Sequence, residues 1–144
     1  MDIREKAARM KAVSPFMAAS AEDVRNKALR AVADAITEQK QQIIEENLKD
    51  LRAAEEKGIP APVMKRLKFG EEKIADVLGG IGELIGLADP LNKITLAREL
   101  DEGLKLYRQT CAIGVIGVIF EARPDAMVQV ASLCIKSGNC AMVK

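Results

Sequence analysis

The sequence predicts an α/β chain in which a helical region precedes a β-hairpin and the first strand–helix–strand unit of a parallel nucleotide-binding sheet. Apolar residues recur at helical spacing up to about residue 90, and the period becomes that of strands after Pro90. Residues 113–143 then spell an apolar strand, a loop, a helix and a second apolar strand. This order is one βαβ unit, the building block of such sheets.

The composition is that of a globular protein and disfavours several classes of partner. The chain has 144 residues, of which 49% are hydrophobic and 30% charged. Acidic and basic residues nearly cancel, at 21 against 22, and aromatic residues make up 3%, so nucleic acid is not an expected partner. The N-terminus lacks the apolar stretch of a signal peptide, and the longest apolar run, 111–120, is too short to cross a bilayer. We therefore expect a cytoplasmic protein.

The inventory of reactive side chains is narrow. The chain has no histidine, which removes the commonest general base and metal ligand. Its three cysteines have no CxxC spacing, so neither a disulfide framework nor a metal site is predicted. Any chemistry must use Cys, Lys, Arg or carboxylates, or residues outside this chain.

The first elements are predicted to be helices. Asp2 is expected to cap a first helix, with Pro15 disturbing its end. Ser20 followed by Asp23 resembles a capping box. It would open one long helix over 21–57, with intermixed charges on its solvated outer face and an apolar stripe towards the core.

Further elements follow up to the hairpin. A short helix is predicted over 63–67 and another over 71–87, although three glycines lower the helix propensity of the latter. Two strands are predicted over 94–100 and 104–110, joined by a short hairpin loop at 101–103.

The last region carries the βαβ pattern. The β-branched run 113–120 is typical of a strand buried on both faces of a parallel sheet. Asp125 is expected to cap a helix over 126–136, and 140–143 is the next strand. Because a sheet that stops there has an unpaired apolar edge, we expect the chain to be a piece of a longer protein.

Residues 113–144 (IGVIGVIFEARPDAMVQVASLCIKSGNCAMVK) resemble the signature region of the gamma-glutamyl phosphate reductase (glutamate-5-semialdehyde dehydrogenase) family of the aldehyde dehydrogenase superfamily. The combination of the Glu121-x-Arg123-Pro124 turn with Ser137-Gly138-Asn139 carries the resemblance. Ala112 stands where the family usually has Pro. Weaker matches extend it over the whole chain: 45–54, 64–67, Asp89-Pro90 and Gly103-Leu104.

The resemblance implies an aldehyde-dehydrogenase-like fold, cut off before its catalytic domain. It assigns 1–90 to an N-terminal helical region, 91–110 to an oligomerisation-type hairpin and 111–144 to the start of an NADP-binding domain. It suggests a homo-oligomer formed through the 94–110 hairpin. It also suggests a functional link to glutamate 5-kinase.

The implied reaction is the NADPH-dependent reduction of L-glutamyl 5-phosphate to L-glutamate 5-semialdehyde, with release of phosphate, in proline biosynthesis. In the family a cysteine thiolate displaces phosphate to give a thioester, and hydride from the nicotinamide reduces the thioester. That cysteine is expected beyond Lys144, so no catalytic residue is assigned here and the chain alone is expected to be inactive. The prediction of NADPH, as opposed to NADH, rests on the resemblance alone.

Four residues are implied to bind the cofactor. Lys144, at the end of the last strand, matches a lysine that contacts the adenosine ribose or its 2'-phosphate. Ile119, Phe120 and Glu121 match the strand end whose backbone passes along the cofactor. The alternatives are a solvated chain end for Lys144, core positions for Ile119 and Phe120, and an ion pair with Arg123 for Glu121, whose carboxylate follows an apolar run.

One residue, Arg123, is implied to bind substrate. It aligns with a side-chain oxyanion donor of the superfamily, and its guanidinium could hold the acyl phosphate or the substrate carboxylate bidentately. The alternative is an exposed turn arginine that neutralises Asp125.

The cysteines and two glycines are assigned structural roles. Gly114 and Gly117 form GxxG inside a strand, which is not the dinucleotide fingerprint, and close backbone packing is the better account. Nothing in the pattern lowers a cysteine pKa. The three cysteines are Cys111, Cys134 and Cys140.

Two other functions stay open on the sequence. One is a different aldehyde or acyl-phosphate oxidoreductase of the superfamily, which substrate assays on a complete protein would separate. The other is a non-enzymatic helical interaction module, which predicts no cofactor affinity in any context.

Overall fold

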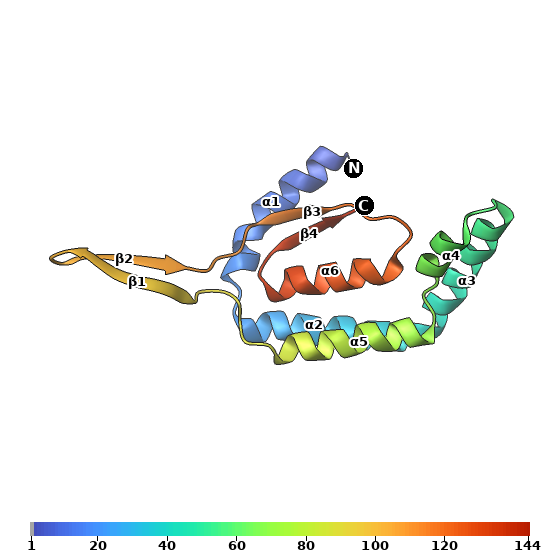
Figure 1. Ribbon diagram of the computed structural model, residues 1–144, viewed down its shortest axis with the longest axis horizontal. Helices are drawn as coiled ribbons and strands as arrows, with labels where there is room; N and C mark the ends of the chain where they lie inside the picture. Colours follow the sequence, from blue (N-terminus) through green and yellow to red (C-terminus); the bar gives the residue numbers. More distant parts are fainter. Residues whose placement is uncertain (1) are drawn as a thin grey trace.

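The chain is arranged in layers around a two-stranded parallel sheet. A computed structural model describes residues 2–144. Helix α1 (Ile3–Ala19) covers one face of the sheet, α6 (Pro124–Lys136) covers the other, and α2 and α5 form a further layer beyond α6 (Figure 1). Within residues 2–144, no helix has both the length and the apolar character needed to cross a membrane.

Helix α1 begins as predicted but continues past its proline. Asp2 is the N-cap, and its backbone N–H donates to Glu5 Oε2 at 3.3 Å. Pro15 was expected to disturb the end of the helix, but α1 runs to Ala19 and Pro15 lies inside it. Pro15 has no N–H for the carbonyl of Lys11, and Ser14 Oγ donates to that carbonyl instead, at 3.0 Å.

The long helix predicted over 21–57 is wrong, because the chain forms α2 (Glu22–Glu38) and α3 (Lys40–Glu56) with a break at Gln39 (φ −98°, ψ 11°). Helix α2 packs on α5 and α6, whereas α3 turns away to meet α4 (Figure 1). The predicted cap is also wrong. The Ser20 hydroxyl donates to the carbonyl of Met17 at the end of α1, at 2.6 Å, and does not cap α2.

A buried asparagine joins α3 to the next two helices. Helices α4 (Ala61–Leu67) and α5 (Glu71–Gly86) lie close to their predicted positions. Between them, Asn47 Nδ2 donates to the carbonyl of Leu67 at 2.9 Å, and Asn47 Oδ1 accepts from the N–H of Phe69 at 2.7 Å. These bonds hold α3 at its angle to α2, which helix periodicity alone cannot specify.

The hydrophobic core lies between helices rather than within the sheet. Partly buried apolar residues from α2, α3, α5 and α6 surround it. Burying one such large side chain stabilises the fold by about 1.5–3 kcal/mol. The fully buried apolar members are Leu29, Phe69, Ile74, Val77 and Ile81.

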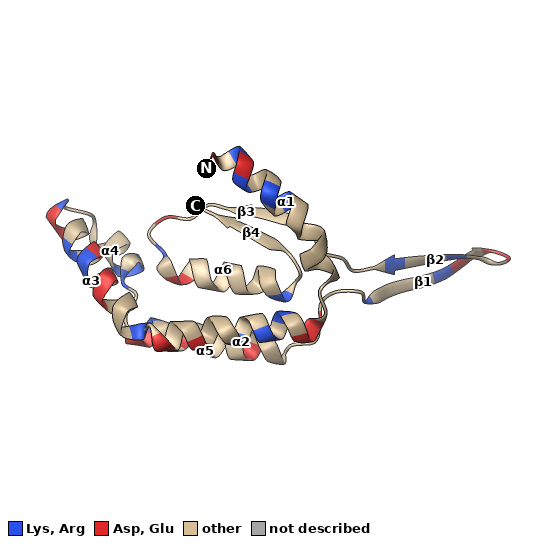
Figure 2. Cartoon of the chain, turned by 180° about the vertical axis from the view of Figure 1, so that it is seen from behind, with Lys and Arg blue, Asp and Glu red and all other residues tan. Residues whose placement is uncertain are grey.

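The predicted hairpin is confirmed as an antiparallel pair. Strands β1 (Ile94–Asp101) and β2 (Leu104–Gln109) meet at a tight turn in which Gly103 has φ +75°. The pair extends away from the other elements (Figure 1), and every residue in both strands is exposed. Residues of both charges lie along it and along α3 (Figure 2).

The predicted βαβ unit is confirmed. Strands β3 (Val115–Val118) and β4 (Cys140–Val143) pair in parallel on either side of α6 in the sequence. The expectation of a strand over 113–120 buried on both faces is wrong. Its flanking residues Ile113 and Ile119 are 83% and 86% exposed, because β3 has a single neighbouring strand in residues 2–144.

The Ser137-Gly138-Asn139 turn fixes the start of both strands. Asn139 Oδ1 accepts from the backbone N–H groups of Ile113 and Gly114, at 2.7 and 2.8 Å. Gly138 has φ +68°, and a Cβ there would lie 2.7 Å from Leu91 Cδ1. The Ser137-Gly138-Asn139 part of the motif that carries the resemblance therefore has a structural role.

A buried lysine ties the crossover helix to the helical layer. Lys136, at the end of α6, is 3% exposed. Its Nζ donates to Glu22 Oε1 at 3.0 Å, to Asn26 Oδ1 at 3.0 Å and to the carbonyl of Ile85 at 3.2 Å. One ammonium group therefore joins α2, α5 and α6.

A second buried cation closes the same layer. Arg25 Nη2 lies 2.6 Å from Asp89 Oδ2, and Arg25 Nη1 donates to the carbonyl of Ser20. Burial by itself would raise the pKa of Asp89. The N–H of Leu91 and the Arg25 guanidinium outweigh this effect, so the pKa of Asp89 lies below its ordinary value.

Candidate functional site

The C-terminal ends of β3 and β4 bring the predicted cofactor residues together. The N–H of Lys144 donates to the carbonyl of Val118 at 3.0 Å, and the N–H of Phe120 donates to the carbonyl of Lys144 at 3.0 Å. Lys144 therefore lies beside the chain that continues through Glu121 to Arg123. Open α/β sheets bind their ligands at this edge.

The loop after β3 presents Arg123 in a constrained backbone. Ala122 has φ +50°, a left-handed conformation that costs an alanine roughly 1–2 kcal/mol. Pro124 is the first residue of α6, and Arg123 is its N-cap. Asp125 therefore lies inside the first turn, and the prediction that it caps the helix is wrong. Unfavourable backbone conformations of this kind cluster at functional sites.

The Arg123 guanidinium remains available to an anion. Its side chain is 53% exposed, and Nη2 lies 3.9 Å from Asp125 Oδ2, which is too long for a hydrogen bond. Asp125 also faces Lys73 of α5, whose Nζ lies 3.6 Å from the same oxygen. Asp125 therefore has a second cation beside it, and its weak contact with Arg123 does not occupy the guanidinium donors.

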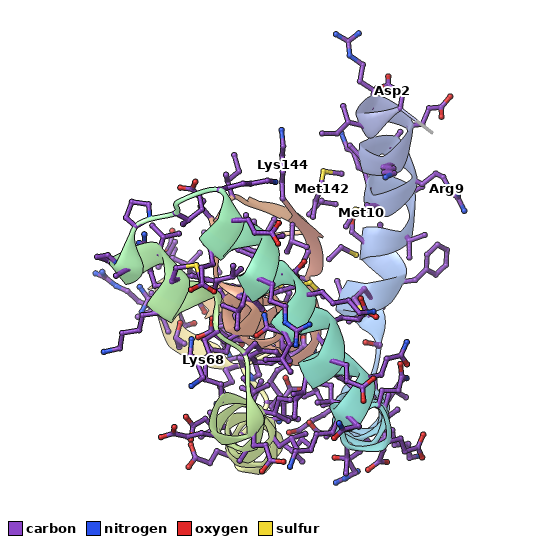
Figure 3. All side chains as sticks on the ribbon, turned by 90° about the vertical axis from the view of Figure 1, so that its right-hand side faces the viewer. Asp2, Arg9, Met10, Lys68, Met142 and Lys144 are labelled. Carbon is purple, nitrogen blue, oxygen red and sulfur yellow. The ribbon has the colours of Figure 1, made fainter. Side chains whose placement is uncertain are left out.

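A cavity of about 490 Å³ lies between α1 and this edge. Two of the predicted cofactor residues, Ile119 and Lys144, line it together with Gly117 and Met142. Helix α1 contributes Ile3 and Lys6 to the opposite wall. Figure 3 shows Met142 beside α1, near Met10. No local sequence pattern predicts this wall, because the position of α1 over the sheet depends on tertiary packing.

The remaining predicted residues have simple environments. Ile119 is 86% exposed, so its alternative as a core residue is wrong. Phe120 is half-buried beside Lys144. Glu121 is exposed and, within residues 2–144, forms no ion pair with Arg123. The structure therefore gathers Ile119, Phe120 and Lys144 at one strand edge, with Arg123 in the loop that follows.

The three cysteines differ in burial. Burial raises the pKa of the Cys134 thiol, and the neighbouring Cys140 raises it further, so Cys134 is a poor nucleophile. Cys140 is partly buried at the start of β4, and Cys111 is exposed. In the described part of the chain, no three His, Cys, Asp or Glu side chains gather as a metal site.

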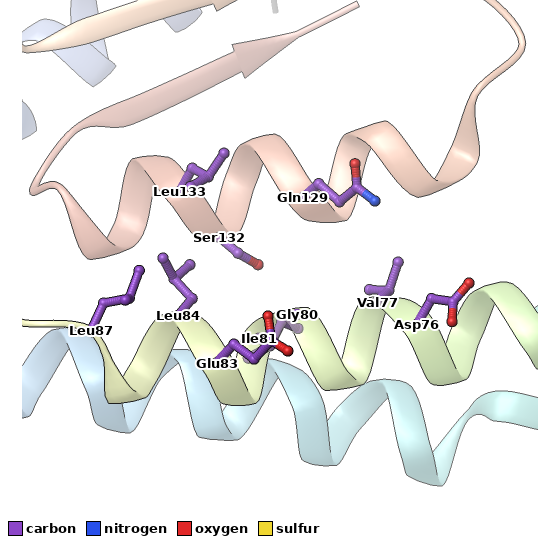
Figure 4. Close-up of a pocket in the computed structure, with 10 residues that line it drawn as sticks. All are labelled: Asp76, Val77, Gly80, Ile81, Glu83, Leu84, Leu87, Gln129, Ser132 and Leu133. Atoms are coloured by element: carbon purple, nitrogen blue, oxygen red, sulfur yellow. The ribbon is translucent and has the colours of Figure 1, made fainter.

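A second cavity, of about 320 Å³, lies between α5 and α6 (Figure 4). Leu84 and Leu133 are among its apolar walls, and Asp76, Glu83 and Gln129 are among its polar ones. The sequence reasoning did not predict it. It includes no residue of the β3–β4 edge.

The layers and the strand edge define the class of protein. The chain combines a helical layer, a projecting hairpin and a βαβ unit, with Lys144 at the end of β4 and Arg123 in the loop after β3, on the side of the sheet where α/β proteins bind ligands.

Comparison with known proteins shows what the chain is similar to. No family model matches the chain. It is 50% identical over all 144 residues to the gamma-glutamyl phosphate reductase of Acetivibrio thermocellus, and 49% identical to that of Ruminiclostridium cellulolyticum. It covers 33% of each relative. The chain is thus homologous to gamma-glutamyl phosphate reductases over its whole length and spans about a third of theirs.

Solved structures agree with the sequence comparison. The crystal structure of gamma-glutamyl phosphate reductase from Saccharomyces cerevisiae matches 100% of this chain and 37% of its own, with a TM-score of 0.94 and 36% identity. The Thermotoga maritima enzyme matches 99% of this chain and 34% of its own, with a TM-score of 0.93 and 28% identity. The predicted fold and the resemblance on residues 113–144 are confirmed.

Proposed function

We propose that the chain forms the part of a gamma-glutamyl phosphate reductase that holds the adenosine end of NADPH and one anionic group of the substrate. The reaction is the reduction of L-glutamyl 5-phosphate to L-glutamate 5-semialdehyde, with release of phosphate, in proline biosynthesis. The observation that carries this proposal is the placement of Lys144 and Arg123 after the same ends of two parallel strands. The 50% identity to a named reductase supports it.

Lys144 and the strand end before it are suited to the cofactor. NADPH would supply the hydride. Among residues 2–144 the Lys144 ammonium has no carboxylate partner, so it can pair with a phosphate at the adenosine end. The backbone of Ile119, Phe120 and Glu121 continues along the same edge, where it can follow the cofactor.

Arg123 is suited to the substrate. A guanidinium carries five donors in a planar fork, which matches both an acyl phosphate and a carboxylate. The left-handed Ala122 and the fixed Pro124 orient the backbone of Arg123 and lower its freedom before substrate arrives. Arg123 would then hold the substrate and stabilise charge on its oxygens.

The nucleophile is proposed to come from the part of the reductase that this chain does not match. Cys134 is buried with a raised pKa, and the chain has no histidine to activate a thiol. The 144 residues alone should therefore give no reductase activity. Semialdehyde-dependent reduction of NADP⁺ by this chain alone would refute the assignment.

The hairpin is proposed to join copies of the protein. All residues of β1 and β2 are exposed, including Leu96, Leu100, Leu104 and Leu106. Unpaired strand edges of this kind are stabilised when a second chain covers them. The proposed units are 1–90, the 91–110 hairpin and 111–144, with assembly into a homo-oligomer through 94–110.

Two further proposals concern the cell. We place the protein in the cytoplasm, where a biosynthetic reductase would meet its substrate. We also propose a functional link with glutamate 5-kinase, because acyl phosphates hydrolyse readily and benefit from a nearby consumer.

A chimera tests the proposed function. Residues 1–144 would replace the matching third of the Acetivibrio thermocellus reductase, and phosphate-dependent oxidation of glutamate 5-semialdehyde would be followed through NADP⁺ reduction. Arg123→Ala should lower kcat/KM roughly a hundredfold, as loss of an oxyanion donor does. Arg123→Lys should recover part of it, and Arg30→Ala on the exposed face of α2 serves as the control. A soluble, folded chimera without activity would refute the function.

A further inference from the structure

Two lysines from the opposite ends of the chain share one cavity. Lys6 lies on the first turns of α1, and Lys144 follows β4. Both line the cavity of about 490 Å³ between α1 and the strand ends. Its volume falls in the range of roughly 300–1,000 Å³ that is typical of small-molecule sites.

Lys144 lies at the strand ends, where residues of β3 and β4 line the cavity beside α1. Side chains at every second position of a strand share a face. On β4, Cys140 and Met142 line cavities along α1, and Lys144 is the next residue on that face. On β3, Val115 and Gly117 likewise line cavities that α1 closes. Lys144 and Lys6 therefore line the same cavity beside the sheet.

The two cations have no counter-ion in the structure. Within residues 2–144, neither Lys6 nor Lys144 forms an ion pair. The acidic residues nearest in sequence to Lys6 are Asp2 and Glu5, which form the capping box of α1 with each other. Two like charges held at one cavity repel, and a bound anion would relieve that repulsion.

Gly117 keeps the floor of the cavity open. A Cβ at Gly117 would meet no atom within 4 Å, and its φ lies outside the left-handed region. Close backbone packing, expected from the sequence, is therefore wrong at this glycine. A strand position with space for a Cβ that it does not carry leaves room for a ligand.

The far end of α1 is held firmly. Met17 O and Ala18 Cα lie 3.5 and 3.4 Å from the position that a Cβ on Gly138 would occupy, and Arg25 bonds the carbonyl of Ser20. The cavity lies at the other end of α1, where Ile3 and Lys6 line it.

We propose that this cleft binds a phosphate group of an adenine nucleotide cofactor between Lys6 and Lys144, with Gly117 as its open floor. The inference rests on the proposed function and deepens it, because it adds a cation from α1 to the cofactor site. The ammonium groups supply charge and hydrogen bonds to the phosphate.

The test compares NADP⁺ with NAD⁺ in the same chimera. Lys6→Gln should raise KM for NADP⁺ roughly fivefold, the effect of losing one solvent-exposed charge contact, with kcat unchanged. Gly117→Val should also raise that KM, by filling the floor, while the melting temperature stays the same or rises because valine favours strands. Lys11→Gln, on the same helix but lining another cavity, is the matched control.

The outcomes distinguish failure of the phosphate cleft from failure of the proposed function. A rise for NADP⁺ alone assigns the contact to the 2'-phosphate, and an equal rise for NAD⁺ assigns it to the pyrophosphate. Phosphate binding in the cleft is refuted if the chimera is active and neither Lys6→Gln nor Gly117→Val changes the KM of either cofactor. It is also refuted if these variants change only the KM of the semialdehyde. A folded chimera with no activity instead overturns the proposed function.

Discussion

Replacing Lys136 by Met should destabilise the fold strongly while conserving the volume of the side chain. The buried ammonium donates three hydrogen bonds, to Glu22, Asn26 and the carbonyl of Ile85. Removing one partner of a buried ion pair costs about 3–5 kcal/mol. The Glu22 side chain is 40% exposed and can be rehydrated, so the lower end applies. We expect a loss of about 3 kcal/mol.

The assay is thermal and urea unfolding of the 144-residue chain, followed by far-UV circular dichroism because the chain has no Trp and one Tyr. A loss of about 3 kcal/mol should lower the melting temperature by roughly 6–12 °C for a domain of this size. The double variant Lys136→Met with Glu22→Leu should recover part of the loss, since no unpaired charge remains. A single variant that loses less than about 1 kcal/mol would show that this ammonium does not join the three helices.

The other predictions concern three single positions. Asn139→Ala should cost about 2–3 kcal/mol in urea unfolding, because two backbone N–H groups before β3 lose their acceptor; a loss below 0.5 kcal/mol would contradict this. Ala122→Gly should raise the melting temperature slightly and lower kcat in the chimera, by relaxing the loop before Arg123; unchanged kcat would argue against an orienting role. Because folding lowers the pKa of Asp89 from its ordinary value of 3.8, the Asp89 carboxylate stabilises the fold at pH values above 3.8. This contribution disappears as the pH falls through the lower pKa of the folded state. Asp89→Asn should flatten that acid limb, and an unchanged pH profile of stability would contradict the ion pair.

Most helices and strands were predicted from local sequence patterns, because the residues of each element carry its periodicity and its turn signals. The change of period after Pro90, the turn at Gly103 and the apolar stretches before and after α6 placed the hairpin and the βαβ unit. The break at Gln39 had no such signal, since helix-forming residues continue across it. Tertiary packing of α3 on α4 decides it, and local propensity is too weak to compete with packing of that kind.

The candidate site likewise has one part that the sequence predicts and one part that depends on tertiary packing. Parallel topology alone predicts that Lys144 and Arg123 lie at one edge, because both follow the carboxyl ends of neighbouring strands. Lys6 could not be predicted in this way. It reaches the strand ends only because α1 lies over the sheet. That placement brings Met17 and Ala18 close to Gly138, between residues far apart in the sequence, so that a Cβ on Gly138 would crowd them.

Residues of the signature region, 113–144, have separate roles at the two ends of the β3–β4 sheet. At the start, Asn139 binds the amides before β3 just as the chain enters β4, so it sets the register that pairs Val115 with Cys140. That register continues to Val118 opposite Val143 and to Phe120 beside Lys144. A slip of one residue would turn Lys144 to the opposite face of the sheet, away from α1. The turn at one end of the sheet therefore sets the strand register at the other end, where Lys144 lies.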